Sequence, residues 1–257
     1  MKQILLMIAL VALVGCGTTK PTPPKPFTNT LGMKFVPVPG TDVQFCIWET
    51  RVKDYAAYAA ANAGVDGSWK KPSFLGTSFT QEDTHPVVKV SWNDAQAFCE
   101  WLTKKELAEG KIKAGQKYRL PTDAEWSVAV GLGKEKGNTP KEKQSGIKGV
   151  YPWGKEWPPP VGAGNYYKSQ KVDIFEYTSP VGSFAANKLG LHDMGGNVWE
   201  WCEDWYRSGN SYRVLRGASW NYYYPVDLLS SFRLNFTPGG RYYSIGFRCV
   251  LVGGSGG

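Results

Sequence analysis

The apolar residues near the start of the chain follow two different periods. Two short runs, residues 35–38 and 43–48, predict strands that are joined by a turn at Pro39-Gly40. Residues 50–61 instead place apolar side chains on one face at a spacing of 3.6 residues, which predicts a helix. That face consists of Val52, Tyr55, Ala56 and Ala59.

Two further helices are expected at residues that can cap them. Ser91 precedes an apolar stripe that extends to about Glu109, so we expect Ser91 to be the N-cap. Thr122 and Glu125 have the spacing of a capping box and predict a third helix just after Leu120. The stripe that follows Ser91 consists of Ala95, Phe98, Cys99, Trp101 and Leu102.

Neither period is visible over residues 131–183. After them, only short strands near residues 213–216 and 246–251 are expected. Long irregular stretches inside a compact domain are associated with function or with bound ions. The pattern therefore predicts a loop-rich α+β domain.

The N-terminus carries an export signal. Lys2 precedes an uncharged apolar run, residues 4–14, which is too short to span a bilayer and has the length of a signal-peptide core. Residues 13–16 (LVGC) resemble the bacterial lipobox, in which the Cys becomes the lipid-modified first residue of the mature protein. The alternative is a plain secretory signal with an incidental Cys. We predict a signal peptide over residues 1–15 and a lipid on Cys16.

Residues 16–29 contain four prolines and few large apolar side chains, so we predict a spacer between lipid and domain. Gly17 and Thr18 follow the lipidated Cys, and this favours transfer to the outer membrane and the cell surface. Residues 253–257 form a Gly/Ser tail that is either native or an added linker.

Composition narrows the function. The net charge is +8, but the lysines are scattered among glutamates and form no basic stripe, so nucleic acid is a poor candidate partner. Eleven Trp and fourteen Tyr can fill a large core. After export, the four remaining cysteines can pair in three ways, and spacing alone does not choose among them. They are Cys46, Cys99, Cys202 and Cys249.

Six motifs occur in a fixed order along the chain. They are residues 88–101 (VKVSWNDAQAFCEW), 118–126 (YRLPTDAEW), 151–154 (YPWG), 190–205 (GLHDMGGNVWEWCEDW), 216–220 (RGASW) and 246–249 (GFRC). Together they resemble the formylglycine-generating-enzyme, or sulfatase-modifying-factor, family. The resemblance implies a single α+β domain of the C-type-lectin-like fold with little regular secondary structure, here over residues 30–252.

The resemblance also implies a disulfide and bound calcium. It suggests the pair Cys99–Cys249, which leaves Cys46 and Cys202 either paired or as buried thiols. Calcium prefers hard oxygen ligands, including backbone carbonyls; the alternative is that the two carboxylates of the first site cap turns and pair with arginines. The first implied site consists of Asp193, Gly196, Val198 and Glu200, and the second of Asn165, Tyr166, Asp173 and Phe175.

The catalytic groups of the family are not found in this sequence. Its enzymes use two cysteines just after a Gly-Gly-Ser-Tyr motif and bind copper, and the matching positions here fall near Tyr222 and Asp227. No Cys lies between Cys202 and Cys249, so thiolate ligation of Cu(I) is excluded there. The two histidines are too few for the three-histidine iron site of the sulfoxide-synthase relatives. We therefore expect no catalytic residues, no copper and no enzymatic activity.

Residues 220–249 resemble the variable region of diversity-generating-retroelement target proteins, several of which use this scaffold. In those systems AAY codons become NNY codons, which cannot encode Lys, Glu, Gln, Met or Trp. None of these types occurs at the sixteen positions that we assign to a ligand-binding face. These are Asn221, Tyr222, Tyr223, Tyr224, Val226, Asp227, Phe232, Leu234, Asn235, Phe236, Gly239, Gly240, Tyr242, Tyr243, Ser244 and Ile245.

Tyr, Ser, Gly and Asn on loops suit a binding surface, because Tyr offers a large rigid contact and the others adapt their hydrogen bonds. The alternative is that these aromatic residues belong to the core, with Phe232 and Leu234 as the first candidates. We predict a lipid-anchored, non-catalytic display protein that binds an unknown protein or glycan on another cell, phage or host. Two alternatives are a formylglycine-generating-type oxidase, or other sulfatase-modifying-factor-like enzyme, and a sugar-binding lectin with an open calcium site.

Overall fold

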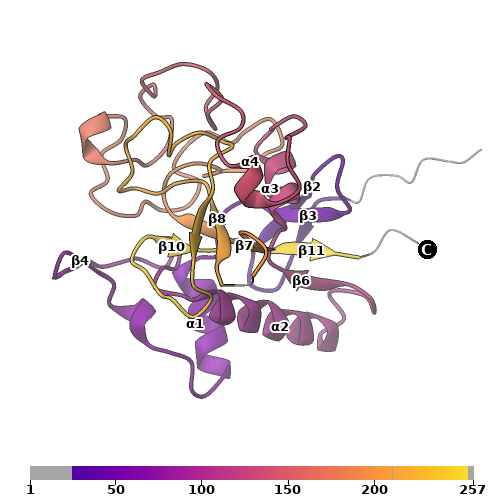
Figure 1. Cartoon of the computed structure of the whole chain (residues 1–257). Helices are drawn as coiled ribbons and strands as arrows, with labels where there is room; N and C mark the ends of the chain where they lie inside the picture. The colour runs from indigo at the N-terminus through magenta and orange to yellow at the C-terminus, as the bar shows by residue number, and fades with distance from the viewer. Residues whose placement is uncertain (1–24, 210, 254–257) are drawn as a thin grey trace, which may run out of the picture.

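The computed structural model describes residues 25–209 and 211–253 (Figure 1). Its larger sheet has five strands in the order β1-β2-β3-β11-β6, and every neighbouring pair is antiparallel. The C-terminal strand therefore lies between strands from the first half of the chain. The strands are β1 (Phe27–Thr28), β2 (Lys34–Pro37), β3 (Val43–Cys46), β11 (Val250–Val252) and β6 (Lys117–Arg119).

A second sheet has four strands in the order β10-β7-β8-β9. Its β10–β7 pair is parallel, whereas β7–β8 and β8–β9 are antiparallel. A separate hairpin is formed by β4 (Ser73–Phe74) and β5 (Thr77–Ser78). The strands of the second sheet are β10 (Ile245–Gly246), β7 (Trp199–Trp205), β8 (Arg213–Arg216) and β9 (Leu234–Phe236).

The predicted helix starts are confirmed. The Ser91 hydroxyl accepts a hydrogen bond from the Asp94 N–H at the start of α2, and the Thr122 hydroxyl accepts one from Glu125 at the start of α3. In Figure 1, α2 lies along one edge of the molecule, next to α1. The helices are α1 (Val52–Ala61), α2 (Trp92–Ala108), α3 (Asp123–Ala129) and α4 (Pro140–Lys143), with short 3₁₀ turns η1 (Ser68–Lys70) and η2 (Lys168–Gln170).

The irregular middle was also predicted correctly, since residues 131–183 contain only α4 and η2. The longest strand, β7, was not predicted, because its sequence WEWCEDW lies in a motif without a clean alternation. The predicted spacer was too long. Phe27 and Thr28 pair with β2, and the buried Asn29 side chain accepts hydrogen bonds from Leu31 and Met33, so the last spacer residues belong to the domain.

The largest hydrophobic cluster is rich in aromatic residues and contains side chains from both sheets. Phe98 stacks on Tyr55 and meets Phe247 edge-on, so the two helices pack directly on the chain segment that leads into β11. Such burial of large rings is the main stabilising contribution to the domain. In the described ranges, no helix is both long and apolar enough to cross a membrane. The predicted signal peptide and Cys16 lie outside the described residues, as do residues 254–257 of the tail.

Candidate binding face and its buried frame

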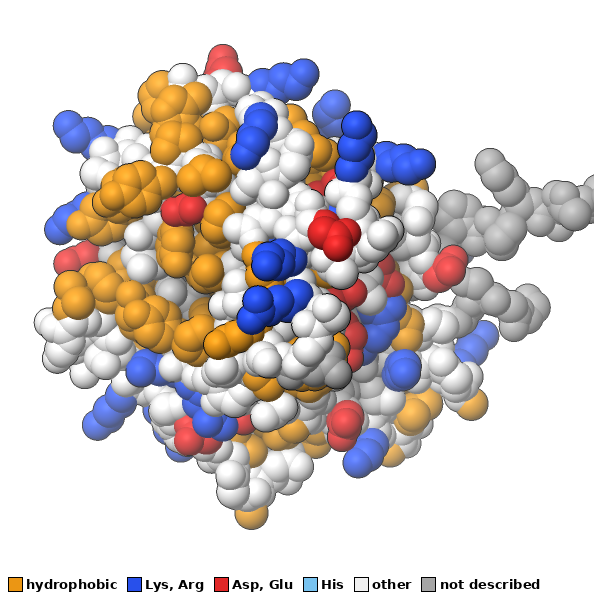
Figure 2. All heavy atoms as spheres, viewed as in Figure 1, with side chains coloured by type: hydrophobic (Ala, Val, Ile, Leu, Met, Phe, Trp, Pro, Cys, Tyr) orange, Lys and Arg blue, Asp and Glu red, His pale blue; other side chains and the backbone are white. Residues whose placement is uncertain are grey.

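Residues 220–249 connect β8 to β11 and carry the predicted face. Several positions of this segment outside the sixteen are buried: Trp220, Arg233 and the run 228–231 are nearly inaccessible, and we call them the framework positions. By contrast, Tyr224, Val226 and Tyr242 are 56%, 45% and 44% exposed. In Figure 2, hydrophobic side chains gather over β10 and the loops around it, with Lys and Arg side chains at their edges.

Two of the sixteen positions do not belong to this surface. Ser244 and Ile245 are 1% and 2% exposed, and Ile245 pairs with Trp199 across the parallel β10–β7 contact. Their side chains lie in the core, so their assignment to the face is corrected. The other fourteen are half-buried or exposed; Phe232 and Leu234 are half-buried and pack against the core, as the alternative reading anticipated.

The tyrosines form two contacting pairs on the face. The ring centroids of Tyr223 and Tyr224 are 4.2 Å apart, and those of Tyr242 and Tyr243 are also 4.2 Å apart. Tyr222 lies deeper and meets the buried Trp199 edge-on at 5.0 Å. Each pair therefore rests on neighbouring rings and presents a large apolar surface with hydroxyl groups at its edge.

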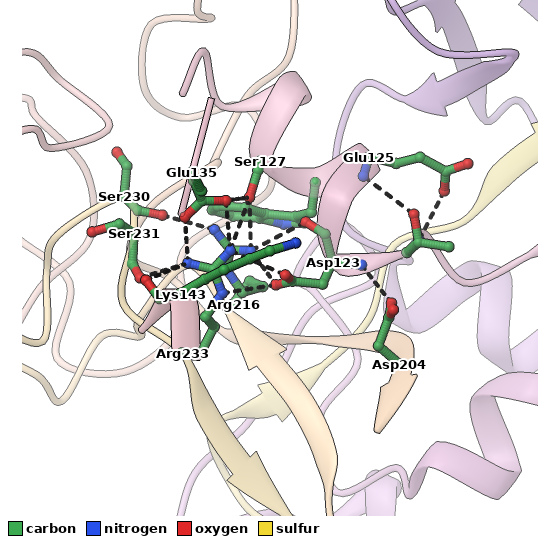
Figure 3. A network of polar contacts seen from close by, with 12 residues as sticks. Asp123, Glu125, Ser127, Glu135, Lys143, Asp204, Arg216, Ser230, Ser231 and Arg233 are labelled. Atoms are coloured by element: carbon green, nitrogen blue, oxygen red, sulfur yellow. Dashed lines mark hydrogen bonds and ion pairs between the residues drawn. The ribbon is translucent and has the colours of Figure 1, made fainter. Parts of the chain in front are cut away.

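A buried network of ion pairs and hydrogen bonds holds residues 228–233 against the core (Figure 3). The Asp123 carboxylate accepts hydrogen bonds from Arg233 Nε and Nη2, both at 3.0 Å, and from Arg216 Nη1. Arg233 also forms an ion pair with Glu135 at 2.6 Å. Arg216 Nη2 donates to the Ser230 carbonyl at 2.9 Å, which holds the framework run directly.

This network balances two arginines against two acids inside the protein. Burial alone would raise the pKa of the Asp123 carboxyl, but the Arg216 and Arg233 guanidinium groups outweigh it and hold that pKa below its ordinary value. The pKa of Glu135 is lowered in the same way, against burial, by its bonds to Arg233 and Ser127. Both acids are therefore charged at neutral pH.

Tyr222 and Asp227, near which the family resemblance would place the catalytic pair, carry a phenol and a carboxyl group. Burial raises the pKa of Tyr222 and that of Asp227. Neither group can act as a thiolate nucleophile or as a soft copper ligand. The four described cysteines are all buried and lie elsewhere in the domain.

The sulfurs of Cys99 and Cys249 lie 3.6 Å apart as unlinked thiols. This is longer than the roughly 2.05 Å of a disulfide, although the two residues are adjacent. Cys46 and Cys202 are also free thiols, and they are buried in different hydrophobic clusters. The Cys99–Cys249 pairing stays a prediction that rests on the family resemblance, and pairing of Cys46 with Cys202 stays one of the two alternatives left open.

The residues of the first implied calcium site are partly engaged with other groups. Arg248 donates to both Glu200 carboxylate oxygens, and Trp126 donates to one of them. Asp193 accepts from the Gly182 N–H, but its Oδ1 is buried without a hydrogen-bond partner. The arginine pairing that we considered as the alternative is therefore present at Glu200.

A residue that the sequence did not indicate lies beside this site. Glu49 follows β3, is fully buried, and neither of its carboxylate oxygens has a hydrogen-bond partner. Burial, and then the neighbouring Asp193 carboxylate, raises the pKa of Glu49 well above its ordinary value. Buried unpartnered oxygens are costly unless a proton or a cation compensates them, so this pair fits an oxygen-preferring cation.

The residues of the second implied site are also partly engaged with other groups. Asn165 is fully buried and its Oδ1 has no hydrogen-bond partner, while its amide nitrogen donates to the Tyr177 carbonyl. The Asp173 carboxylate accepts from the N–H groups of Tyr166 and Phe175. Within the described residues, no three acidic, His or Cys side chains converge on one point, so backbone carbonyls would have to supply further ligands.

A model of the sulfatase-modifying factor enzyme 1-like domain (FGE-sulfatase) matches residues 24–252. The chain belongs to this family. It is 35% identical over 202 residues to the inactive Cα-formylglycine-generating enzyme 2 of Bos taurus, covering 72% of this chain and 56% of that protein. It is 37% identical over 145 residues to the formylglycine-generating enzyme of Thermomonospora curvata, covering 54% and 39%. The chain thus spans about half, or less, of the length of these relatives.

Solved structures share the fold. PvdO from Pseudomonas aeruginosa superposes with a TM-score of 0.64 at 21% identity, covering 90% of this chain and 99% of that one. Treponema denticola variable protein 1 superposes with a TM-score of 0.53 at 22% identity, covering 90% and 92%. At these identities the likeness concerns the fold alone. The predicted fold class, an α+β domain of the formylglycine-generating-enzyme type, is confirmed.

Proposed function

We propose that this FGE-sulfatase-family chain is a non-catalytic, lipid-anchored binding protein whose variable face is diversified by a retroelement. The observation that carries the proposal is the contrast within residues 220–249. Arg233 and the Ser230 carbonyl are held in the core by the Asp123 network, whereas fourteen of the sixteen positions chosen as variable are half-buried or exposed. Side chains on a surface can be replaced without loss of the fold only where the buried residues that hold the backbone do not depend on them.

The family names are compatible with a non-catalytic role. Among the relatives, the protein from Bos taurus is named as inactive, whereas the one from Thermomonospora curvata is named as an enzyme. The solved variable protein of Treponema denticola shares the fold with this chain. We therefore propose that the scaffold serves as a frame here, with calcium as a structural ion at the oxygen-rich sites and with no copper.

The arrangement of the ends suits display from a membrane. In Figure 1, β2, β3 and β11 lie on one side of the molecule, and β4 and β10 lie on the other. The start of the described chain pairs with β2, so an anchor at Cys16 would hold the domain by the side away from the face. The face would then point outward, toward a protein or glycan on another cell, phage or host.

The diversification proposal is tested on the gene and its flanking DNA. We expect a near-copy of the segment that encodes residues 220–249, with AAY codons at the accessible variable positions and a reverse-transcriptase gene nearby. Absence of any such repeat from the genome would refute diversification and leave the scaffold and its face in place.

The anchor and the lack of catalysis have separate tests. Cys16→Ser should abolish incorporation of labelled palmitate and move the protein out of the membrane fraction; retention in membranes would contradict the anchor.

The purified chain, supplied with copper and oxygen, should not modify a cysteine-containing sulfatase peptide, which mass spectrometry of the peptide checks. Formation of formylglycine would instead favour the oxidase.

A further inference from the structure

A groove of about 180 Å³ borders the variable face. One wall is the β4–β5 hairpin with Leu75, and the other is formed by Tyr167, Lys168 and Glu176. None of these residues belongs to the sixteen variable positions. The groove is therefore built from constant parts of the chain.

Both walls are in direct contact with variable tyrosines. The ring centroids of Phe74 and Tyr243 are 4.8 Å apart, and those of Tyr167 and Tyr223 are 5.3 Å apart. The Tyr167 N–H donates to the Tyr222 carbonyl at 3.1 Å. Constant and variable side chains thus form one continuous surface, and a ligand that covers the tyrosines would also cover the groove.

The tip of the hairpin carries an apolar side chain that nothing in the described chain covers. Leu75 is 88% exposed and adopts a left-handed backbone conformation with φ of 49°, followed by Gly76 with φ of 83°. Leu is uncommon in this conformation, because its side chain crowds the backbone there. A type I′ two-residue hairpin turn requires positive φ at both central residues, so the turn explains the conformation but not the choice of a Leu side chain that is left exposed.

The constant charges beside the face are mainly positive. Lys168 and Lys171 are exposed at the two ends of the η2 turn, whose Gln170 donates to the Tyr223 carbonyl. Lys89 donates its backbone N–H to the Tyr242 carbonyl, so a third lysine lies at the opposite tyrosine pair. Glu176 is the acid in the groove wall. Positive groups around an apolar centre favour a partner with the opposite arrangement.

We propose that Leu75, Tyr167 and Lys168 form a constant rim that contacts each ligand of the variable face, and that the ligand is a protein with acidic residues around an apolar spot. This proposal rests on the proposed function. A lipid surface would fit the same charges, but the face lies away from the side at which the anchor would hold the domain (Figure 1). A fixed rim gives a baseline of affinity and orientation, and the variable residues then set specificity.

The test selects binders from a phage-displayed peptide library on the full chain in detergent. We expect the enriched peptides to carry Asp or Glu beside aromatic or aliphatic residues. Leu75→Asp and Lys168→Glu should each weaken the selected peptides by about tenfold, the size of a substantial interface contact. Leu107→Asp and Lys104→Glu on the exposed side of α2 are the matched controls and should leave binding unchanged. Asp tolerates left-handed backbone, so Leu75→Asp should fold, which its thermal unfolding checks.

The outcomes separate the two proposals. If Tyr223→Ala and Tyr242→Ala abolish peptide binding while Leu75→Asp and Lys168→Glu do not, the variable face stands and the constant rim is refuted. If the enriched peptides carry no acidic residues, the proposed partner chemistry is refuted and the variable face stands; if none of the four variants affects binding, both proposals fail. Binding to vesicles that contain phosphatidylserine, but not to neutral vesicles, with loss in Lys168→Glu, would assign the rim to lipid and overturn the protein partner.

Discussion

Asp123 is the residue whose replacement tests most directly how the variable segment is held. Its carboxylate lies between two guanidinium groups that are themselves fully buried, those of Arg216 and Arg233. Glu135 is a second acidic partner of Arg233. Asp123→Asn therefore removes one of the two negative charges while both positive charges stay in the interior.

The structure sets the size of the expected effect. After the change, Arg216 keeps neutral acceptors, namely the Ser230 carbonyl at 2.9 Å and the Ser127 hydroxyl at 3.1 Å. Breaking one partner of a buried ion pair costs about 3–5 kcal/mol, and Asn retains one acceptor, so we expect a loss of roughly 3 kcal/mol. A domain is typically stable by about 5–15 kcal/mol, so the variant should fold but be clearly weakened.

Urea unfolding of the full chain in detergent, followed by tryptophan fluorescence, measures this loss. The chain contains eleven Trp, so the signal follows unfolding of the whole domain, including Trp126, whose ring centroid lies 4.4 Å from the Arg216 guanidinium. The exposed Asp42 provides the matched control, and Asp42→Asn should change the free energy of unfolding by less than about 0.5 kcal/mol. A loss below about 1 kcal/mol for Asp123→Asn would show that the network does not hold the segment.

The same network predicts an acid dependence. The folded-state pKa values of Asp123 and Glu135 lie below their ordinary values of 3.8 and 4.5. Their contribution is therefore fully present above these values and is lost as the pH falls through the folded-state pKa values. Unfolding free energies measured from pH 6 to pH 2.5 should fall steeply in the wild type and less steeply in Asp123→Asn; parallel curves would contradict this.

Three further predictions concern other parts of the molecule. Burial raises the pKa of Glu49, so keeping this carboxylate ionised at neutral pH lowers the stability of the folded protein. Glu49→Gln should therefore raise the melting temperature measured in chelator and reduce the increase in melting temperature on adding Ca²⁺. An unchanged calcium response would exclude Glu49 as a ligand. The Arg213 guanidinium lies 3.7 Å from the ring centroid of Trp92 and 3.5 Å from that of Trp205. Arg213→Ala should therefore lower the unfolding free energy by about 1–2 kcal/mol in a urea titration. An unchanged unfolding free energy would contradict this stacking contribution. Tyr224→Ala should change the unfolding free energy by less than about 0.5 kcal/mol, because the side chain is exposed, and a large loss would assign Tyr224 to the frame.

Local signals in the sequence predicted the helices and much of the face. Ser91 and Thr122 cap helices where their hydroxyls precede an apolar stripe, since capping depends on a few neighbouring residues. The sixteen positions chosen from the sequence include the accessible Tyr224 and leave out the buried Arg233. Packing restricts which residue types a buried position accepts, and this difference is visible in the sequence. The exceptions, Ser244 and Ile245, lead into and lie in a two-residue strand that is too short to show any period.

Long-range pairings could not be predicted in this way. Asp123 is separated from Arg216 by 93 residues and from Arg233 by 110, and no local pattern links them. Glu49 directly follows the apolar run of residues 43–48, and no local signal shows that the fold buries its carboxylate beside Asp193. These contacts depend on how the sheets cross, which is a property of the whole chain.

The position of β11 limits which products of this gene can fold. This strand is synthesised after the whole variable segment, yet it pairs with both β3 and β6 in the interior of the larger sheet. A polypeptide that ends early because its reading frame shifts within residues 220–249 lacks that strand and leaves two sheet edges and their apolar side chains open to proteases. An AAY-to-NNY change never creates a stop codon, because every stop codon ends in a purine. Under the proposed diversification, only chains that extend through β11 can complete the larger sheet and fold.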